Sequence, residues 1–361
     1  MLKILRSLLP AASPTTAAPS LSEPPVRIDV PGAAPFPLTQ HLTSADGLPV
    51  LDWAAVTQWV NTIADESTQA QAWSACELGW LEHLRAALGP SFRLRQQGEA
   101  VLVSSLPDNV ARATLDFMTR TQQRVLRVLD GIAHVPEWGH DILVVFDDPD
   151  CYYRYVAHHY PDAGEYALSS GMYLNHGCGH FLTVRSDLRM IEPVIAHELT
   201  HACLGHLPIP AWLNEGLAVN TEHRLSPPPR PDATPQQMHA RHRRFWGPQE
   251  MQEFWSGQSF LRPDEGNELS YDLARILVSQ LAADWPRFVP FAQAATLDDA
   301  GATAAREHLG VPLGELACAL LEGEPGPHWE PKPSLWTQAP ERGAFRNPTV
   351  LPLGRAAWLL D

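Results

Sequence analysis

Residues 197–201 of this 361-residue chain read His-Glu-Leu-Thr-His, and this run constrains the fold more than any other stretch. Two histidines four positions apart lie on one face of a helix, about one turn apart, so both imidazoles can reach one metal ion. Glu198 stands beside them, where metal-assisted hydrolysis needs a general base. The flanking residues 191–204 are mostly apolar. The sequence therefore predicts a packed helix that carries a metal site.

Catalytic zinc usually takes three protein ligands and leaves a fourth position for water, so a third ligand must come from elsewhere. The metzincin pattern requires a glycine and a histidine at positions that hold Leu204 and Leu207 here, which excludes that pattern. A carboxylate from a following helix is the alternative. Glu215 follows His201 by fourteen positions, enough for a helix end, a turn and one turn of a new helix.

The residues between the two predicted helices support this arrangement. Pro208 and Pro210 break the first helix, and Pro210 suits the start of the second. We expect Trp212 and Leu213 to anchor the second helix against the core. Gly216 allows another backbone to approach closely.

Residues 197–201, together with Pro-Ala-Trp-Leu-Asn-Glu-Gly-Leu-Ala at 210–218, resemble the gluzincin zinc metallopeptidases, in particular the bacterial peptidase-MA-like family. The similarity extends over about residues 92–285 and is strongest at 171–222. It implies an α+β fold with a small twisted mixed sheet, an edge strand over the active-site helix and a mainly helical C-terminal half.

The resemblance also implies the roles of individual residues. His197, His201 and Glu215 would bind zinc, and Glu198 would be the general base that activates the water. Many members of the family have a tyrosine on a later helix that stabilises the oxyanion, and Tyr271 matches that position.

Two parts of the site differ from the family pattern or stay open. His223 is a second candidate for the oxyanion donor. Thermolysin-like relatives have an acidic residue one turn after the glutamate ligand, where this chain has Val219. We expect Asn220 or Glu222 to orient a histidine ligand instead.

These residues predict a hydrolase, a zinc-dependent metallopeptidase that cleaves peptide bonds through a metal-activated water. Two alternatives are a catalytically idle module that binds a peptide along a strand at residues 180–184, and a zinc hydrolase of a non-peptide amide. An idle module has no chemical need for Glu198, which disfavours the first alternative.

The rest of the chain divides by composition and hydrophobic pattern. We expect strands in a hairpin around Gly98, in the apolar run 141–146, and in a second hairpin at 167–174 and 180–184, whose edge strand could pair with a peptide. His176, Cys178 and His180 in the second turn are interpreted as turn residues rather than a second metal site. The predicted divisions are a disordered Pro/Ala-rich tail at 1–45, a helical region at 46–90, the metallopeptidase domain at 91–322 and a Pro-rich arm at 323–361.

The resemblance implies a peptide or protein substrate, and composition argues against other partners. The formal net charge of −15 argues against nucleic acid. The densest basic run, at 241–244, is interpreted as a solvated helix face. No stretch of about 18 apolar residues predicts a membrane span.

Cysteine usage and the N-terminus bear on location. The five cysteines are odd in number and lack C-x-x-C spacing, so we expect reduced, mostly buried thiols. Arg6 and Pro10 interrupt the first leucines, leaving an apolar run too short for a signal peptide. Both features favour a cytoplasmic protein.

Overall fold

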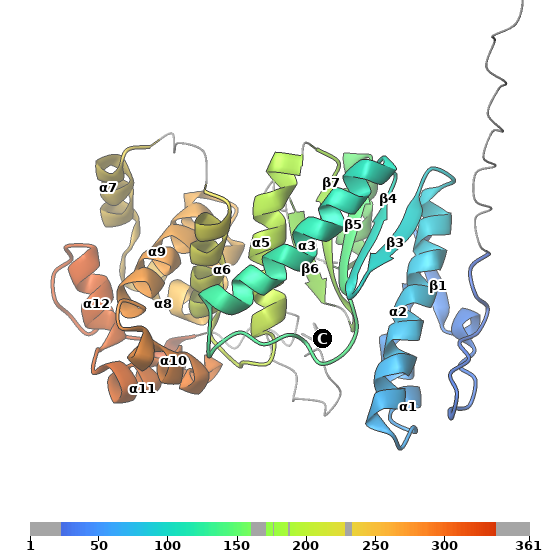
Figure 1. Ribbon diagram of the computed structural model, residues 1–361. Coiled ribbons are helices and arrows are strands. Elements are labelled where there is room, and N and C mark those ends of the chain that lie inside the picture. The colour runs from blue at the N-terminus through green and yellow to red at the C-terminus, as the bar shows by residue number, and fades with distance from the viewer. Residues whose placement is uncertain (1–22, 160–170, 176, 187, 228–232, 337–361) are drawn as a thin grey trace, which may run out of the picture.

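The computed structural model describes residues 23–159, 171–175, 177–186, 188–227 and 233–336. A five-stranded mixed sheet with helices on both faces is followed along the chain by a helical half (Figure 1). The predicted α+β class is confirmed. None of the helices in these ranges has the length and apolar character needed to cross a lipid bilayer.

The sheet has the strand order β3-β4-β5-β7-β6. The hairpins β3/β4 and β6/β7 are antiparallel, whereas β4, β5 and β7 are mutually parallel neighbours. Every residue of β5 is buried, as its continuous apolar run predicts. The bounds are β3 (Arg93–Gln97), β4 (Ala100–Ser104), β5 (Asp141–Phe146), β6 (Gly171–Asn175) and β7 (Gly179–Val184).

The position of β7 corrects one expectation. This strand pairs with β5 on one side and with β6 on the other, so its main chain is already occupied. A peptide cannot add along residues 180–184, and on this side of the sheet the edge is formed, within the described residues, by β6. Sequence alone could not distinguish the two, because both strands of a hairpin carry the same kind of pattern.

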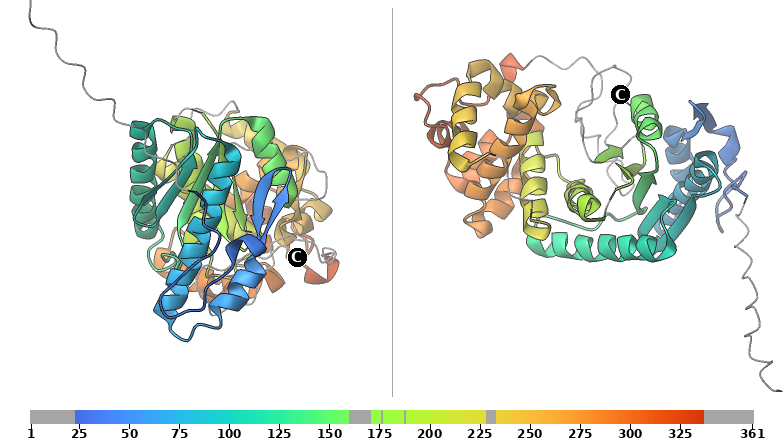
Figure 2. Two further views of the ribbon diagram at one scale, coloured as in Figure 1. Left: turned by 90° about the vertical axis from the view of Figure 1, so that its right-hand side faces the viewer. Right: turned by 90° about the horizontal axis from the view of Figure 1, so that it is seen from above.

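Two helical layers cover the sheet. Alternate side chains of a strand face opposite sides of the sheet, and because apolar residues occupy both sides here, both faces are covered. Leu102, Leu143 and Phe181 pack on one face with α3 (Asp108–Val128) and α5 (Leu188–Leu204). Val103 and Val144 pack on the other face with α1 (Trp53–Val60), α2 (Glu66–Leu88) and α4 (Pro149–His159). Figure 2 shows α2 lying over the strands, and α3 running from the sheet to the helical half.

Residues 23–45 are not part of a disordered tail, contrary to prediction. Ile28, Phe36 and Leu38 are buried against the α2 layer. A Cβ added at Gly79 of α2 would lie 2.8 Å from Ile28 Cδ1, so the segment packs closely on this helix. The segment contains η1 (Leu38–Gln40) and β1 (Leu42–Ala45), which pairs with β2 (Leu48–Leu51). Residues 1–22 lie outside the described residues.

The helical half has its own apolar core, around Trp212, Phe254 and Phe288. The C-terminal arm docks on it in part, since Trp329 is buried and its carbonyl accepts a hydrogen bond from Trp255 Nε1 at 2.8 Å. The elements are α6 (Ala211–Leu225), α7 (Pro235–Phe245), α8 (Pro248–Ser256), η2 (Gln258–Leu261), α9 (Glu265–Leu281), α10 (Trp285–Ala294), η3 (Leu297–Asp299), α11 (Ala302–Ala304), η4 (Ala305–Leu309), α12 (Leu313–Leu320) and η5 (Pro333–Leu335).

The basic run on α7 is less solvated than expected. His242 is buried, and its Nε2 lies 2.9 Å from Asp272 Oδ2 of α9. Arg241 forms ion pairs with Glu265 and Glu268 at the start of α9. The run therefore attaches α7 to α9.

Candidate metal centre

Helix α5 connects the two halves of the molecule and presents the His-Glu-x-x-His run between them. Ile195 and Leu199, four positions apart, pack in the core beneath the sheet. Cys203 and Leu204 near its C-terminus pack in the core of the helical half. These contacts fix the rotation of the helix, and the rings of His197 and His201 lie 4.8 Å apart between centroids.

Helix α6 returns toward α5 because of the residues that predicted it. Pro210 is its N-cap, and Trp212 and Leu213 are fully buried. Trp212 Nε1 donates to Ala300 O at 3.0 Å. A Cβ at Gly216 would lie 2.5 Å from the carbonyl oxygen of Ala274 in α9, so only glycine permits this helix contact.

Glu215 of α6 meets both histidines of α5. Its Oε2 lies 3.2 Å from His197 Nε2 and 3.4 Å from His201 Nε2. One ligand atom from each of the three residues lies within 4.8 Å of the others, the only group of this kind among the described His, Cys, Asp and Glu residues. The structure thus brings together the three predicted metal ligands.

The second nitrogen of each histidine has an acceptor of its own. His197 Nδ1 lies 3.0 Å from Glu222 Oε2, and His201 Nδ1 lies 3.1 Å from Asn214 Oδ1. Each Nδ1 can donate its proton there, which leaves a lone pair on each Nε2. These lone pairs point at the carboxylate of Glu215, which also only accepts. When both histidines are neutral in this tautomer, three acceptors face one another, and a proton on a histidine or a bound metal cation can fill the position between them.

The orienting residues were only partly expected. Glu222 is one of the two candidates predicted from the sequence, and the structure selects it. Asn220 instead donates to Gly216 O and Arg275 O, so its amide contributes to the packing of α6 on α9. Asn214 had no assigned role, although its position next to the predicted ligand Glu215 was a possible signal.

The pKa values of the cluster express the same need for positive charge. Burial alone would lower the pKa of His197, but hydrogen bonds with Glu215 and Glu222 outweigh it and raise this pKa well above its ordinary value. The pKa of His201 is also raised, because the charge of Glu215 outweighs burial. Burial would raise the pKa of Glu215, but His201 and His197 hold it far below its usual range.

Glu198 is buried beside the cluster, with 8% of its surface exposed. Burial raises its pKa above the ordinary value, against the opposing effect of His197 and His201. A carboxyl group whose pKa moves toward neutrality is better suited to take up and return a proton at neutral pH. Its environment therefore matches the role of a general base.

The two candidate oxyanion donors lie in different surroundings. The half-buried ring of Tyr271 in α9 has its centroid 6.4 Å from that of His197 and packs edge-on against Phe260 at 5.2 Å. His223 is half-buried on α6, and burial lowers its pKa while Glu222 opposes this. Packing beside a ligand ring favours Tyr271.

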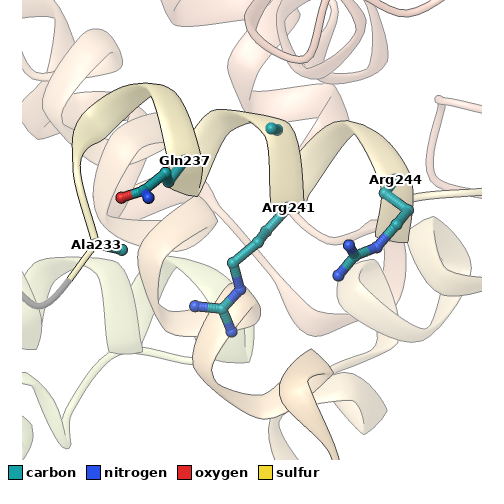
Figure 3. Close-up of a pocket in the computed structure, with 5 residues that line it drawn as sticks. Ala233, Gln237, Arg241 and Arg244 are labelled. Carbon is teal, nitrogen blue, oxygen red and sulfur yellow. The ribbon is translucent and has the colours of Figure 1, made fainter.

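A cavity of about 470 Å³ opens over α7, away from these residues (Figure 3). Gln237, Arg241 and Arg244 contribute its polar lining. Both arginines form ion pairs with Glu265. Arg241 also pairs with Glu268, so two carboxylates balance the two arginine charges, and the cavity lacks the convergent ligand groups of the His197, His201 and Glu215 cluster.

Comparisons with protein-family models, curated proteins and solved structures yield no match to this chain. The assignment of a function therefore depends on the geometry of α5, α6 and α9.

Proposed function

We propose that this protein is a zinc-dependent peptidase of the gluzincin type. The observation that carries the proposal is the contact of Glu215 Oε2 with the Nε2 atoms of His197 and His201, at 3.2 and 3.4 Å. The Nδ1 atoms of both histidines are already directed at oxygen acceptors. With both imidazoles neutral, this arrangement leaves three lone-pair donors pointing at a common position.

The donor set fits zinc in particular. Two imidazoles and one carboxylate are a common set of protein ligands at catalytic zinc sites. Bound there, zinc would lower the pKa of a water molecule to about 7 and polarise a substrate carbonyl. The resemblance to the gluzincins rests on the same three residues.

The chain's own residues would perform the remaining steps. Glu198 takes a proton from the attacking water and passes it to the leaving amine. Tyr271 donates a hydrogen bond to the oxyanion of the tetrahedral intermediate. Glu222 and Asn214 hold the two ligand imidazoles in orientation through Nδ1.

The sheet supplies a place for an extended peptide. α5 packs against β6 and β7, and among the described strands β6 forms the edge of the sheet on this side. An exposed strand edge binds peptides through main-chain hydrogen bonds. We propose that the substrate pairs with β6, which favours a peptide over a small non-peptide amide.

Metal analysis combined with Glu198→Gln tests the proposal. The wild-type protein should bind one zinc ion and cleave peptides from a mixed library, and a chelator should abolish cleavage. Glu198→Gln should keep the zinc and lower kcat by about 10²- to 10⁴-fold, the usual contribution of a general base. Glu192→Gln, which removes another acid from α5, is the matched control and should leave kcat unchanged.

Cleavage that survives the Glu198→Gln substitution would show that the mechanism is wrong. Bound zinc without cleavage of any peptide would favour the idle module. Failure to bind zinc would overturn the metal site itself.

A further inference from the structure

Glu77 of α2 is fully buried in the apolar layer over the sheet, and the proposed mechanism makes no use of it. Its Oε1 accepts from Trp73 Nε1 at 2.9 Å, and its Oε2 accepts from the backbone N–H of His140 at 2.9 Å. His140 Nδ1 lies 2.7 Å from the same Oε2. A carboxyl group removed from water is tolerated only with such partners.

The fourth hydrogen-bond contact of Glu77 comes from a third residue, in the β6–β7 hairpin. Cys178 Sγ, one residue before β7, donates to Glu77 Oε1 at 3.6 Å. The carbonyl oxygen of Cys178 lies 2.8 Å from His180 Nδ1, and the His180 ring packs edge-on against Trp80 of α2 at 5.2 Å. One buried carboxyl group therefore joins α2, the start of β5 and the turn of this hairpin.

Gly177 makes a second, independent contact between the turn and the N-terminal layer. Its φ is +87°, and a Cβ there would lie 2.2 Å from the Cβ of Trp53 in α1. Trp53 itself packs against Trp73 and Trp80, with centroids 5.3 and 5.7 Å away. Only glycine lets the turn rest on this tryptophan cluster.

We infer that Glu77 and Gly177 are positioning residues that fix the edge strand β6 by holding the turn of its hairpin on α1 and α2. The inference rests on the proposed function, because β6 is the strand along which the substrate would pair. The layer formed by α1 and α2, which precedes the sheet in the sequence, thereby controls substrate binding. The candidate metal ligands lie elsewhere, on α5 and α6.

The first test compares two glycines at hairpin turns. Gly177→Ala inserts a Cβ into Trp53, whereas Gly47→Ala has a similar φ of +83° in the β1–β2 hairpin with nothing within 4 Å. Gly177→Ala should raise KM by about tenfold or more, with kcat and zinc affinity within about twofold of wild type. Gly47→Ala carries the same backbone strain and should leave KM unchanged.

The second test compares two variants, each of which removes one hydrogen-bond donor to Glu77 Oε1. It keeps the inference testable if Gly177→Ala fails to fold. Cys178→Ala removes the donor on the hairpin, and Trp73→Phe removes a donor within α2. Hydrogen exchange of the β6–β7 amides should be at least about tenfold faster in Cys178→Ala than in Trp73→Phe. This readout requires neither zinc nor activity.

The outcomes separate the inference from the proposed function. Wild-type protein that cleaves no peptide overturns the proposed function and with it any role of the hairpin in catalysis. Cleavage by wild type with unchanged KM in Gly177→Ala, or equal hairpin exchange in the second pair, overturns the positioning role alone. A kcat loss or zinc loss in Gly177→Ala without a KM change also contradicts it.

Discussion

Glu77 and Glu215 are buried glutamates in contact with histidine in the part of the chain that the structure describes, and they differ in what surrounds the carboxyl group. Glu77 is contacted by Trp73, His140 and Cys178. Glu215 is contacted by the Nε2 atoms of His197 and His201. Proximity of a carboxylate to histidine is common to both, so proximity alone does not identify a metal site.

The inventory of hydrogen-bond donors separates the two clusters. The oxygens of Glu77 accept from an indole N–H, a backbone N–H and a thiol, all of which carry their own hydrogens. The imidazoles facing Glu215 have Nδ1 acceptors in Glu222 and Asn214, so in their neutral form the Nε2 atoms present lone pairs. The first cluster is satisfied by donors that keep their hydrogens, whereas the second needs either protons on its histidines or a bound cation.

The largest expected difference is in zinc binding, and a matched pair of substitutions measures it. Glu215→Gln replaces a charged ligand by a neutral amide and should weaken zinc binding by more than the roughly 10- to 100-fold typical of a supporting residue. Glu77→Gln should leave zinc affinity unchanged. It should lower the free energy of unfolding by about 1–3 kcal/mol, because one amide oxygen cannot satisfy all the buried donors.

Zinc titration measures the zinc affinity of the two variants, and denaturant unfolding measures their free energy of unfolding. Equal zinc loss in both variants would contradict the distinction between the clusters. So would full zinc affinity in Glu215→Gln.

A smaller effect distinguishes the two residues that the sequence proposed as support for a ligand. Glu222→Gln should lower zinc affinity by about 10- to 100-fold, because it removes the charged acceptor at His197 Nδ1. Asn220→Ala removes hydrogen bonds to Gly216 O and Arg275 O, and should cost about 1 kcal/mol of stability with zinc affinity intact. The reverse pattern would show that Asn220 is the supporting residue.

The smallest effect is the dependence of stability on pH. In metal-free protein, the raised pKa of His197 stabilises the fold fully below its ordinary value of 6.5, and this contribution is lost as pH rises through the raised folded-state value. The lowered pKa of Glu215 stabilises the fold above its ordinary value of 4.5, and this contribution is lost only in stronger acid.

Zinc should remove this decline above pH 6.5, because the ligands that hold zinc have already lost their protons. The free energy by which zinc stabilises the fold should therefore grow from pH 6 to pH 9, by about 1.4 kcal/mol per pH unit for each proton displaced, and the increase in Tm on adding zinc should grow with it. Thermal denaturation with zinc and with chelator across this range measures it. A zinc effect that is constant over the range would contradict protonated histidines in the metal-free site.

Much of the candidate site could be predicted because its spacing is local. The four-residue separation of His197 and His201 places them on one helical face, and Pro210, Trp212 and Gly216 define the helix that returns Glu215. Periodic patterns also predicted both hairpins of the main sheet and strand β5. These features depend on neighbours in the sequence, which the sequence displays directly.

Features that depend on distant neighbours were missed or misplaced. Residues 23–45 lack periodicity, yet Ile28 and Leu38 are buried against α2. The pattern of 180–184 resembled an edge strand, and pairing with β5 places it inside the sheet. Asn214 and Glu222 could be distinguished from other polar residues only by the histidine nitrogens they face.

The chain's local pattern was sufficient for the α+β class and for the helix with two histidines, since helix periodicity sets which side chains share a face, and the proline break before residue 211 was sufficient to return Glu215 toward them. Packing between helices far apart in the sequence determines the rest. The rotations of α5 and α6 direct the Nε2 lone pairs of His197 and His201 at Glu215, and α2 holds a second glutamate among donors. The same residue types thus form a candidate metal centre in one place and a structural contact in another.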